Sequence, residues 1–167
     1  MKTEIFLQKE IDDKFLEEIE KNLNVKVYRN ANSLNIESED GYKLLKTKEI
    51  IDAYIFGFSE EECRKLFNEN FRFQIIEIKN FLRNKNNRNR LRELKGRVIG
   101  EKGKTKRNIE ELTKSKIIIK RNIIGIISSE ENYDLVRRAI EMILEGRMHS
   151  TVYSFIIKEL QKRKNII

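Results

Sequence analysis

A four-residue segment with a glycine at each end, Gly100-Glu101-Lys102-Gly103, constrains the fold of this chain more than any other feature. It follows the apolar pair Val98-Ile99 and precedes a basic stretch in which Ile109 and Leu112 recur at helical spacing. Two glycines three positions apart leave the backbone of a turn open to close approach. A helix that begins just after them offers unpaired N–H groups and the positive end of its dipole. The segment therefore predicts an anion-binding turn that opens a helix.

The elements predicted after this turn have the order found in a KH domain. Beyond the helix, a strand over 117–120 leads through a turn near Arg121-Asn122 into a second strand over 123–128. Apolar residues at helical spacing then predict a helix over 131–145. KH domains use a glycine–x–x–glycine loop to clamp about four nucleotides of a single strand. The order favours such a clamp over the alternative, a structural turn with incidental basic residues.

A P-loop is the competing interpretation of the same glycine-rich segment. Gly103-Lys104-Thr105 matches the end of that motif, which requires a further glycine five positions before the Gly-Lys pair. Val98 occupies the required position, and the glycines that are present are Gly96 and Gly100. The spacing therefore excludes a P-loop.

Positive charge is concentrated in one central part of the chain. The net charge is +8, but residues 1–78 carry 12 basic and 17 acidic side chains, whereas residues 79–121 carry 16 basic and 4 acidic ones. A solvated face is the usual explanation of such a run, yet this one surrounds the glycine turn. The distribution therefore favours a nucleic-acid-binding surface in the second half.

A second basic stretch, 83–90, consists of asparagine and cations without any apolar residue. This composition predicts a surface loop. Its cations are candidate contacts to the phosphate backbone of RNA, and a flexible solubilising loop is the alternative interpretation. The four candidates are Arg83, Lys85, Arg88 and Arg90.

The two halves of the chain repeat one plan of elements. In the first half we expect a helix that ends over 16–19, strands over 25–28 and 34–37, and a helix over 42–56. The same order follows the glycine turn in the second half. The sequence therefore predicts an α+β fold of two tandem KH-like modules. Residues 1–70 form the first module, and residues 71–167 form the second, which has an extra C-terminal helix from about Ser150.

The first module lacks a glycine turn of its own. When Leu16 is aligned with Ile109, the turn should fall near 7–10, but the first glycine of the chain is Gly41. A phosphate would be repelled by the acidic residues of this region. We therefore expect a degenerate copy that serves packing or protein contacts. The acidic residues concerned are Glu10, Asp12 and Asp13.

Residues 71–78 read as a strand that opens the second module. Phe71, Phe73 and Ile75 alternate along it, so we expect these three side chains on one face.

Residue types that carry catalysis or bind metals are scarce. His149 is the only histidine, and the acidic groups lie on predicted amphipathic helices. The single cysteine, Cys63, excludes an internal disulfide framework and is expected to be a core thiol. No apolar run approaches the roughly 18 residues of a membrane span, and the N-terminus lacks the long apolar region of a signal peptide. We expect a cytoplasmic protein without enzymatic activity, metal or cofactor.

Three segments match one family in detail. They are the glycine-turn segment 96–105, the tail motif His149-Ser150-Thr151-Val152-Tyr153, and the helix beginning at 48–51 with its exit Gly57-Phe58-Ser59. With them the chain resembles, over essentially its whole length, the archaeal and eukaryotic small-subunit ribosome-assembly KH proteins known as the partner of Nob family. Two features depart from that family: the first glycine loop is missing, and Glu101 stands where a basic residue is usual.

The resemblance implies type I KH modules, the second of which binds the single-stranded 3′ region of small-subunit ribosomal RNA. It also implies contacts with the Nob endonuclease, the Dim dimethyltransferase and the alpha subunit of initiation factor two. The residues alone leave two alternatives open. One is a general KH regulator of messenger RNA or single-stranded DNA, and the other is a protein-interaction scaffold built on the acidic first module. The candidate RNA-binding residues are Arg97, Ile99, Gly100, Glu101, Lys102, Gly103, Lys104, Thr105, Lys106, Arg107, Ile109, Ile118 and Lys120.

Overall fold

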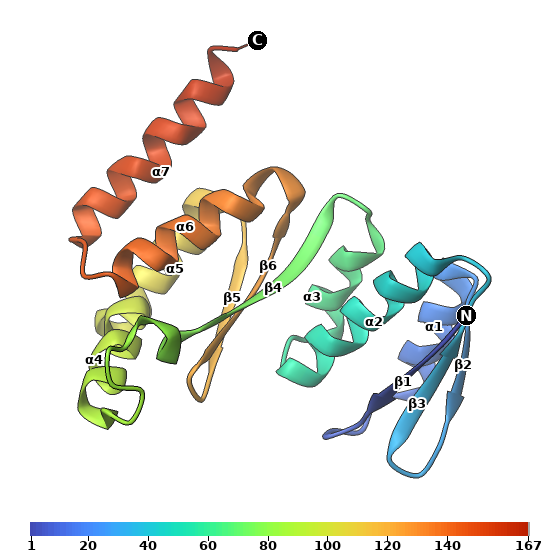
Figure 1. Cartoon of the computed structure of the whole chain (residues 1–167). Helices are drawn as coiled ribbons and strands as arrows, with labels where there is room; N and C mark the ends of the chain where they lie inside the picture. Colours follow the sequence, from blue (N-terminus) through green and yellow to red (C-terminus); the bar gives the residue numbers. More distant parts are fainter. Residues whose placement is uncertain (167) are drawn as a thin grey trace. The chain divides into compact units, whose positions relative to one another are not determined.

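The computed structural model describes residues 1–166, and the chain divides into two compact units, Met1–Phe73 and Gln74–Ile167 (Figure 1). Strand β4 (Phe71–Glu77) crosses the limit between them. Within the described residues, no helix has the length and apolar character needed to cross a membrane.

The first unit is an antiparallel sheet of three strands covered by helices on one face (Figure 1). The strand order is β1-β3-β2, in which Lys2 of β1 pairs with Glu37 of β3. Along β3, Leu34 and Ile36 are fully buried because alternate side chains of a strand point to the helix-covered face. The elements are β1 (Lys2–Phe6), α1 (Asp13–Leu23), β2 (Lys26–Arg29), β3 (Ser33–Glu37), α2 (Gly41–Phe56), α3 (Glu60–Arg64) and a 3₁₀ turn, η1 (Lys65–Phe67).

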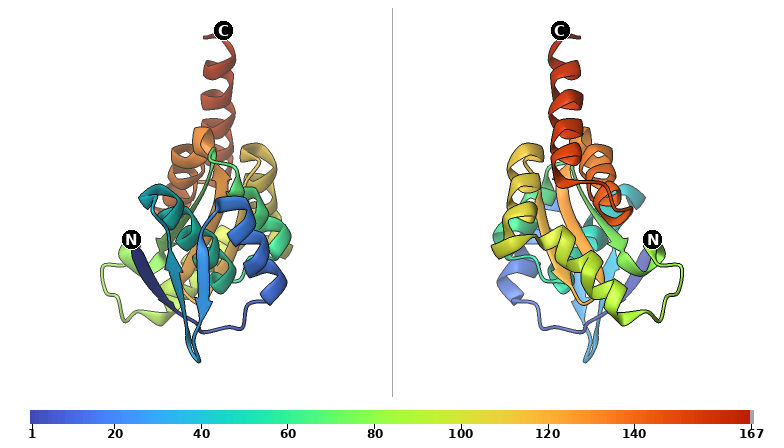
Figure 2. Two further views of the ribbon diagram at one scale, coloured as in Figure 1. Left: turned by 90° about the vertical axis from the view of Figure 1, so that its right-hand side faces the viewer. Right: turned by 90° about the vertical axis from the view of Figure 1, so that its left-hand side faces the viewer.

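The second unit has the same strand order, β4-β6-β5, and a larger set of helices. Helix α7 extends beyond the rest of this unit (Figures 1 and 2). Its buried side chains, Val152 and Ile156, anchor it on the unit's core. Besides β4 the elements are η2 (Ile78–Phe81), α4 (Arg88–Ile99), η3 (Glu101–Gly103), α5 (Lys104–Thr113), β5 (Lys116–Lys120), β6 (Ile123–Ser129), η4 (Glu130–Asn132), α6 (Tyr133–Leu144) and α7 (His149–Lys164).

One helix–strand junction is built in the same way in both units. The Glu20 carboxylate accepts a hydrogen bond from the Val27 amide at 2.6 Å, and the Glu110 carboxylate accepts one from the Ile117 amide at 2.8 Å. Each helix ends at a left-handed residue, Asn24 in one unit and Lys114 in the other. These pairs all stand 90 positions apart in the sequence.

By this spacing Ile19 corresponds to Ile109, three residues away from the predicted alignment of Leu16 with Ile109. Ile19 and Ile109 are both fully buried in their units. The two alignments differ because the prediction matched helix ends, and α1 continues to Leu23. In the first unit, the positions that correspond to Gly100–Gly103 are then 10–13. The acidic residues Glu10, Asp12 and Asp13 still fall within them.

The units differ in the segment that joins the first strand to the helix of this junction, which is α1 in the first unit and α5 in the second. Residues 7–12 make the connection in the first unit, whereas residues 78–103 make it in the second and include all of α4. Strand β1 was not predicted at all. In addition, 83–90 is not wholly a loop, because the Asn87 side chain accepts from the Arg90 amide at 3.0 Å and starts α4 at Arg88.

Strand β4 alternates as expected, with Phe71, Phe73 and Ile75 on one face and the opposite face turned to the core. Gln74, Ile76 and Ile78 are buried, whereas Ile75 is 44% exposed. The Gln74 side chain reaches the core side because its amide donates to the Tyr133 carbonyl at 2.9 Å. A satisfied buried amide thus takes a place that hydrophobicity alone assigns to an apolar residue.

Candidate nucleic-acid interface

The segment between α4 and α5 is a tight turn in which three residues have positive φ. Gly100 lies at φ 75° and ψ 173°, Lys102 at φ 49° and ψ 30°, and Gly103 at φ 75° and ψ 14°. The Gly100 amide donates to the Gly96 carbonyl at 2.8 Å and ends α4, and the Gly103 amide donates to the Gly100 carbonyl at 3.2 Å. The turn is therefore fixed by its own backbone.

Gly100 is required at its position for two independent reasons. Its dihedral angles lie in a region that is essentially restricted to glycine. A Cβ atom added there would also lie 2.2 Å from Thr105 Oγ1 and 2.6 Å from the Thr105 amide nitrogen. The buried Thr105 hydroxyl thus fills the space that a side chain would need.

The turn leaves the N-terminus of α5 open. Gly103 is the N-cap residue and provides no side chain to cap the helix, and among residues 1–166 no side-chain cap is seen there. The matching helix of the first unit is closed, because the Asp12 carboxylate accepts from the Lys14 amide at 2.9 Å. An open helix start with a glycine cap can receive an anion, whereas a helix start capped by a carboxylate already holds one.

The basic side chains around the turn divide into two groups. Lys102 and Lys104 are exposed, and within residues 1–166 no ion pair engages either of them. Lys106 instead pairs with Glu110 at 3.2 Å, and Arg107 donates to the Lys102 carbonyl at 2.9 Å. The first two lysines can therefore meet a ligand, while Lys106 and Arg107 also brace the helix and the turn.

Arg97 has a structural task in this geometry. Its guanidinium donates to the Ile143 carbonyl at 3.3 Å and also to the Arg147 carbonyl, so it ties α4 to the end of α6. His149 completes the tie, since its Nε2 lies 2.9 Å from the Arg97 carbonyl oxygen. Arg97 thus positions the helix that leads into the turn.

The predicted apolar contacts are only partly brought together. Ile99, the last residue of α4, is partly exposed beside the turn. Ile109 is fully buried in the core, which excludes contact between its side chain and RNA. Ile118 and Lys120 alternate with the buried Ile117, so they lie on the face of β5 opposite the core.

Ile119, which the sequence analysis did not single out, lies on the other face of this strand. It packs against the core cluster and remains partly exposed, so it lies on the face of the sheet that carries α4 and α5. The alternation of side chains along a strand could have indicated this, because residues 117 and 119 of one strand lie on the same face.

Glu101 is exposed at the first position of the turn. It lies in the same short 3₁₀ turn as Lys102, whose backbone is left-handed. The acidic residue that departs from the family pattern is thus present at the surface of the turn and is not buried within the fold.

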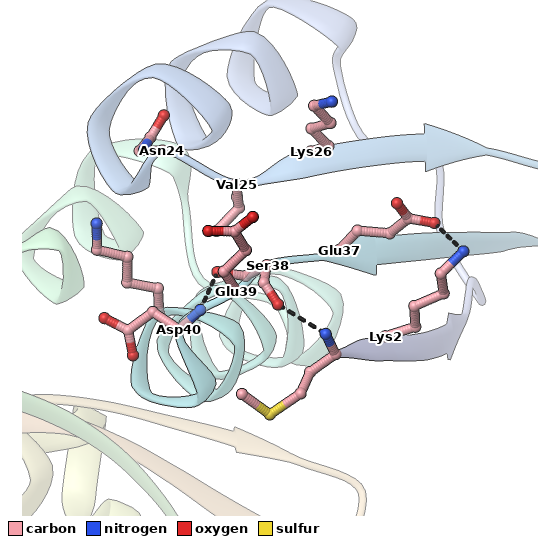
Figure 3. A pocket seen from close by; sticks show the side chains of 10 residues that line it. Lys2, Asn24, Val25, Lys26, Glu37, Ser38, Glu39 and Asp40 are labelled. Atoms are coloured by element: carbon pink, nitrogen blue, oxygen red, sulfur yellow. Dashed lines mark hydrogen bonds and ion pairs between the residues drawn. The ribbon is translucent and has the colours of Figure 1, made fainter.

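The first unit holds a cavity of about 560 Å³ at the end of its sheet, shown in Figure 3. Lys2 lies 2.6 Å from Glu37 there, and the hydrogen bond with this carboxylate raises the pKa of Lys2. The Met1 amine donates to the Ser38 carbonyl at 2.9 Å. Glu39 and Asp40 add carboxylates to the same wall. The charges of this cavity are largely matched internally, so it does not resemble an anion-binding site.

Within residues 1–166, no group of three or more histidine, cysteine or acidic side chains is placed to hold a metal ion. Cys63 is fully buried, as expected for a core thiol.

A glycine turn that opens a helix beside a three-stranded antiparallel sheet is the architecture of a KH domain, a module that binds single-stranded nucleic acid. Residues 72–162 match the PNO1 family model, described as a eukaryotic-type KH domain (KH-domain type I). The chain therefore belongs to the PNO1 family of KH-domain proteins. The predicted resemblance to the partner of Nob family is confirmed, as is a mixed α+β fold with a KH domain.

Similar sequences carry names that agree with this assignment. A KH domain-containing protein of Methanocaldococcus jannaschii is 34% identical over 87% of this chain and 65% of its own length. The RNA-binding protein PNO1 of Oryzias latipes is 29% identical over 83% of this chain and 59% of its own length. The pre-rRNA-processing protein PNO1 of Gibberella zeae is 27% identical over 66% and 43%. The chain thus spans less than two thirds of each of these relatives.

Solved structures share the fold over nearly the whole chain. A protein of unknown function from Aeropyrum pernix has a TM-score of 0.84 and 28% identity, covering 99% of this chain and 96% of that one. Dim2p of Pyrococcus horikoshii, solved in a complex with a/eIF2alpha and rRNA, has a TM-score of 0.78 and 24% identity, covering 100% and 96%.

Proposed function

We propose that the second unit binds single-stranded RNA at Gly100–Gly103, that its target is the 3′ region of small-subunit ribosomal RNA during ribosome assembly, and that the protein has no catalytic role. The observation that carries this proposal is the open N-terminus of α5. It stands directly behind a turn whose exposed side chains include Lys102 and Lys104. A phosphate placed there receives backbone N–H donors, the helix dipole and two cations together.

Support for ribosomal RNA as the target comes from the relatives. One of them is named a pre-rRNA-processing protein, and the Pyrococcus horikoshii Dim2p was solved with rRNA. We extend that ligand to this chain because the turn retains both glycines, the geometry they need and the positive surroundings.

The clamp is tested by changing Lys102 to aspartate, with Glu101→Asp as a nearly neutral companion change. Aspartate tolerates the left-handed backbone at Lys102, so the fold is expected to survive. The affinity for a 3′-end ribosomal RNA oligonucleotide should fall about tenfold or more, since a charge-assisted contact of roughly 1.5–3 kcal/mol becomes a repulsion. A gel-shift titration measures the change.

Lys158→Asp on α7 is the matched control for Lys102→Asp. It makes the same change of charge at an exposed position of another helix of the same unit. Equal affinities of the wild-type protein and the Lys102→Asp variant would rule out the clamp.

We further propose that residues 1–70 form a degenerate KH-like module and residues 71–167 a complete one. The common strand order and the repeated Glu20 and Glu110 hydrogen bonds support this division. The Asp12 carboxylate takes the place of a phosphate at the start of α1. The first module then serves packing and protein contacts.

The proposed protein partners are the alpha subunit of initiation factor two, the Nob endonuclease and the Dim dimethyltransferase. The first is supported by the Pyrococcus horikoshii complex, which contains a/eIF2alpha, and the other two by the family resemblance. Pulldown with each purified partner tests them one at a time. Binding that survives Lys102→Asp would assign the contact to a surface other than the turn.

Two alternatives make different predictions from ribosome assembly. A general KH regulator of messenger RNA or single-stranded DNA would bind through the same turn but would not co-sediment with small-subunit precursors. A protein-interaction scaffold would show a flat dependence of binding on salt, whereas phosphate contacts on single strands give a log–log slope of roughly −0.7 each.

A further inference from the structure

A second concentration of positive charge lies at the other end of α4 from the glycine turn. A cavity of about 610 Å³ opens there. It is formed by four segments, namely η2, the loop before α4, the first turn of α4, and the turn between β5 and β6. The residues that line it are Lys79, Lys85, Asn86, Arg88, Leu91 and Asn122.

The backbone holds these segments in place. The Ile78 amide donates to the Asn122 carbonyl at 3.0 Å and joins η2 to the β5–β6 turn. In the loop, the Asn87 amide donates to the Asn84 carbonyl and the Asn86 amide to the Asn84 side chain, both at 3.0 Å. Hydrogen bonds donated by backbone amides therefore fix the turns that form the walls of the cavity.

The cations of this cavity lack acidic partners. Within residues 1–166, no ion pair engages Lys79, Lys85 or Arg88. A neighbouring cavity of about 250 Å³, which shares Lys79 and Asn122, is also lined by the carboxylate of Glu77 and the cation of Arg121. Three unpaired cations at one concave site create a local field that attracts an anion.

The other two cations of the predicted loop are placed differently. Arg90 pairs with Glu93 at 2.6 Å on the surface of α4, and Arg83 does not line the cavity. The structure thus separates Lys85 and Arg88 from Arg83 and Arg90, which the sequence placed together.

We propose that this cavity binds a second phosphate group of the RNA strand that the glycine turn holds, an inference that rests on the proposed function. Arg88 begins α4 and Gly100 directly follows it, so the two sites lie at opposite ends of one helix. Twelve helical residues span about 18 Å at 1.5 Å per residue. A strand longer than the roughly four nucleotides clamped at such a turn can reach both sites.

The chemistry of the cavity suits a phosphodiester group better than a neutral ligand. The Arg88 guanidinium offers a planar fork to two phosphate oxygens, and Lys79 and Lys85 add point charges. The side chains of Asn86 and Asn122 supply neutral donors, and the partly buried Leu91 offers an apolar surface to a sugar.

The test compares two double variants that each remove two positive charges from the same segment. Lys85→Ala with Arg88→Ala empties the cavity of two cations, and Arg83→Ala with Arg90→Ala is the matched control. Each protein is titrated with single-stranded oligoribonucleotides of four and twelve nucleotides that share one sequence, at several salt concentrations. Thermal unfolding verifies that all proteins are folded.

We expect the cavity variant to bind the longer strand about tenfold more weakly, with a salt slope shallower by about 1.4 for two lost contacts at roughly 0.7 each. Its affinity for the four-nucleotide strand should equal that of the wild type, and the control should stay within about twofold on both strands.

Three outcomes would overturn the proposal. The first is an equal loss in both double variants, which indicates unspecific attraction. The second is a wild-type protein that binds the long strand no better than the short one, which removes the second site and leaves the glycine turn intact. The third is saturable binding of inorganic phosphate at the cavity that the long strand does not displace, which indicates a site for a small anion. If the wild-type protein binds the twelve-nucleotide strand but not the four-nucleotide strand, and the cavity variant loses that binding, the clamp at the glycine turn is wrong. The cavity then remains a phosphate site on its own.

Discussion

Replacing Gly100 with alanine would place a methyl group where Thr105 already lies. The added Cβ would stand 2.2 Å from Oγ1 and 2.6 Å from the amide nitrogen of Thr105, at a φ of 75°. Because the second of these atoms belongs to the backbone, a rotation of the Thr105 side chain alone cannot relieve the overlap. We expect the free energy of unfolding to fall by about 3 kcal/mol, combining the backbone strain and the overlap. Urea denaturation measures it.

Gly96→Ala is the control for that substitution. Gly96 lies inside α4, and a Cβ added there meets no atom within 4 Å. Alanine in a helix interior should therefore stabilise the protein by about 0.5–1 kcal/mol. If both substitutions destabilise to the same extent, the argument from the turn geometry fails.

Cys63 should be inert in the folded protein. Burial raises the pKa of its thiol to about 12, with the nearby Glu62 as a second cause. At pH 8 only about one thiol in ten thousand would be ionised, and the thiolate is the reactive form. An alkylating reagent should modify the protein only in denaturant. Because the unfolded state loses this proton at a lower pH, stability should also fall as the pH rises above about 9. Rapid alkylation of the native protein would contradict this.

At this scale, the sequence predicted what depends on local chain geometry. Gly100, Lys102 and Gly103 were identified because a turn with positive φ shows directly in glycine spacing. The burial of Ile109 could not be predicted, because an apolar pattern gives the period of an element but not which face meets the core.

Single elements gain stability from contacts that join distant residues. The Glu110 carboxylate accepts from the Ile117 amide at 2.8 Å and also receives Lys106 at 3.2 Å, which connects α5 to the edge strand β5. Glu110→Ala leaves a backbone donor of a partly buried strand without its partner. The protein should lose about 1–3 kcal/mol of stability, measured by thermal or urea unfolding.

Glu111→Ala tests whether the effect comes from charge alone. Glu111 is the next residue of the same helix and is exposed, so its loss should change the stability by at most about 0.5 kcal/mol. Equal destabilisation by the two substitutions would show that the hydrogen bond to Ile117 has no special weight.

Elements were predictable where their signal is contiguous. The helices α2 and α6 and the strands β5 and β6 have long apolar patterns, and they were found close to their observed limits. Strand β1 was missed because its pairing with β3 is set by residues 27 to 35 positions away. The start of α4 was missed because Asn87, a cap, reads like the rest of an asparagine-rich loop.

For the whole molecule, the decisive property is the separation of charge along the chain. The first 78 residues carry 17 acidic and 12 basic side chains, while residues 79–121 carry 4 and 16. The structure gives this asymmetry a local form: a carboxylate caps α1, and the start of α5 stays open. Sequence alone located the asymmetry, but the basic cavity is formed by four segments that come together only in the fold.

The two units should accordingly divide the labour when they are produced separately. The first piece is best ended at Phe73, because its ring lies 5.9 Å from that of Phe56 and 5.8 Å from that of Phe58. The second should begin at Phe71, the start of β4.

We expect residues 71–167 to keep most of the affinity for a 3′-end ribosomal RNA oligonucleotide and residues 1–73 to bind it negligibly, as measured by fluorescence titration. Circular dichroism verifies that each piece is folded, and Lys102→Asp in the second piece should abolish most of its binding. If the folded piece 1–73 binds this RNA as tightly as the other, a carboxylate-capped helix does not exclude phosphate, and the first unit is an RNA-binding module in its own right.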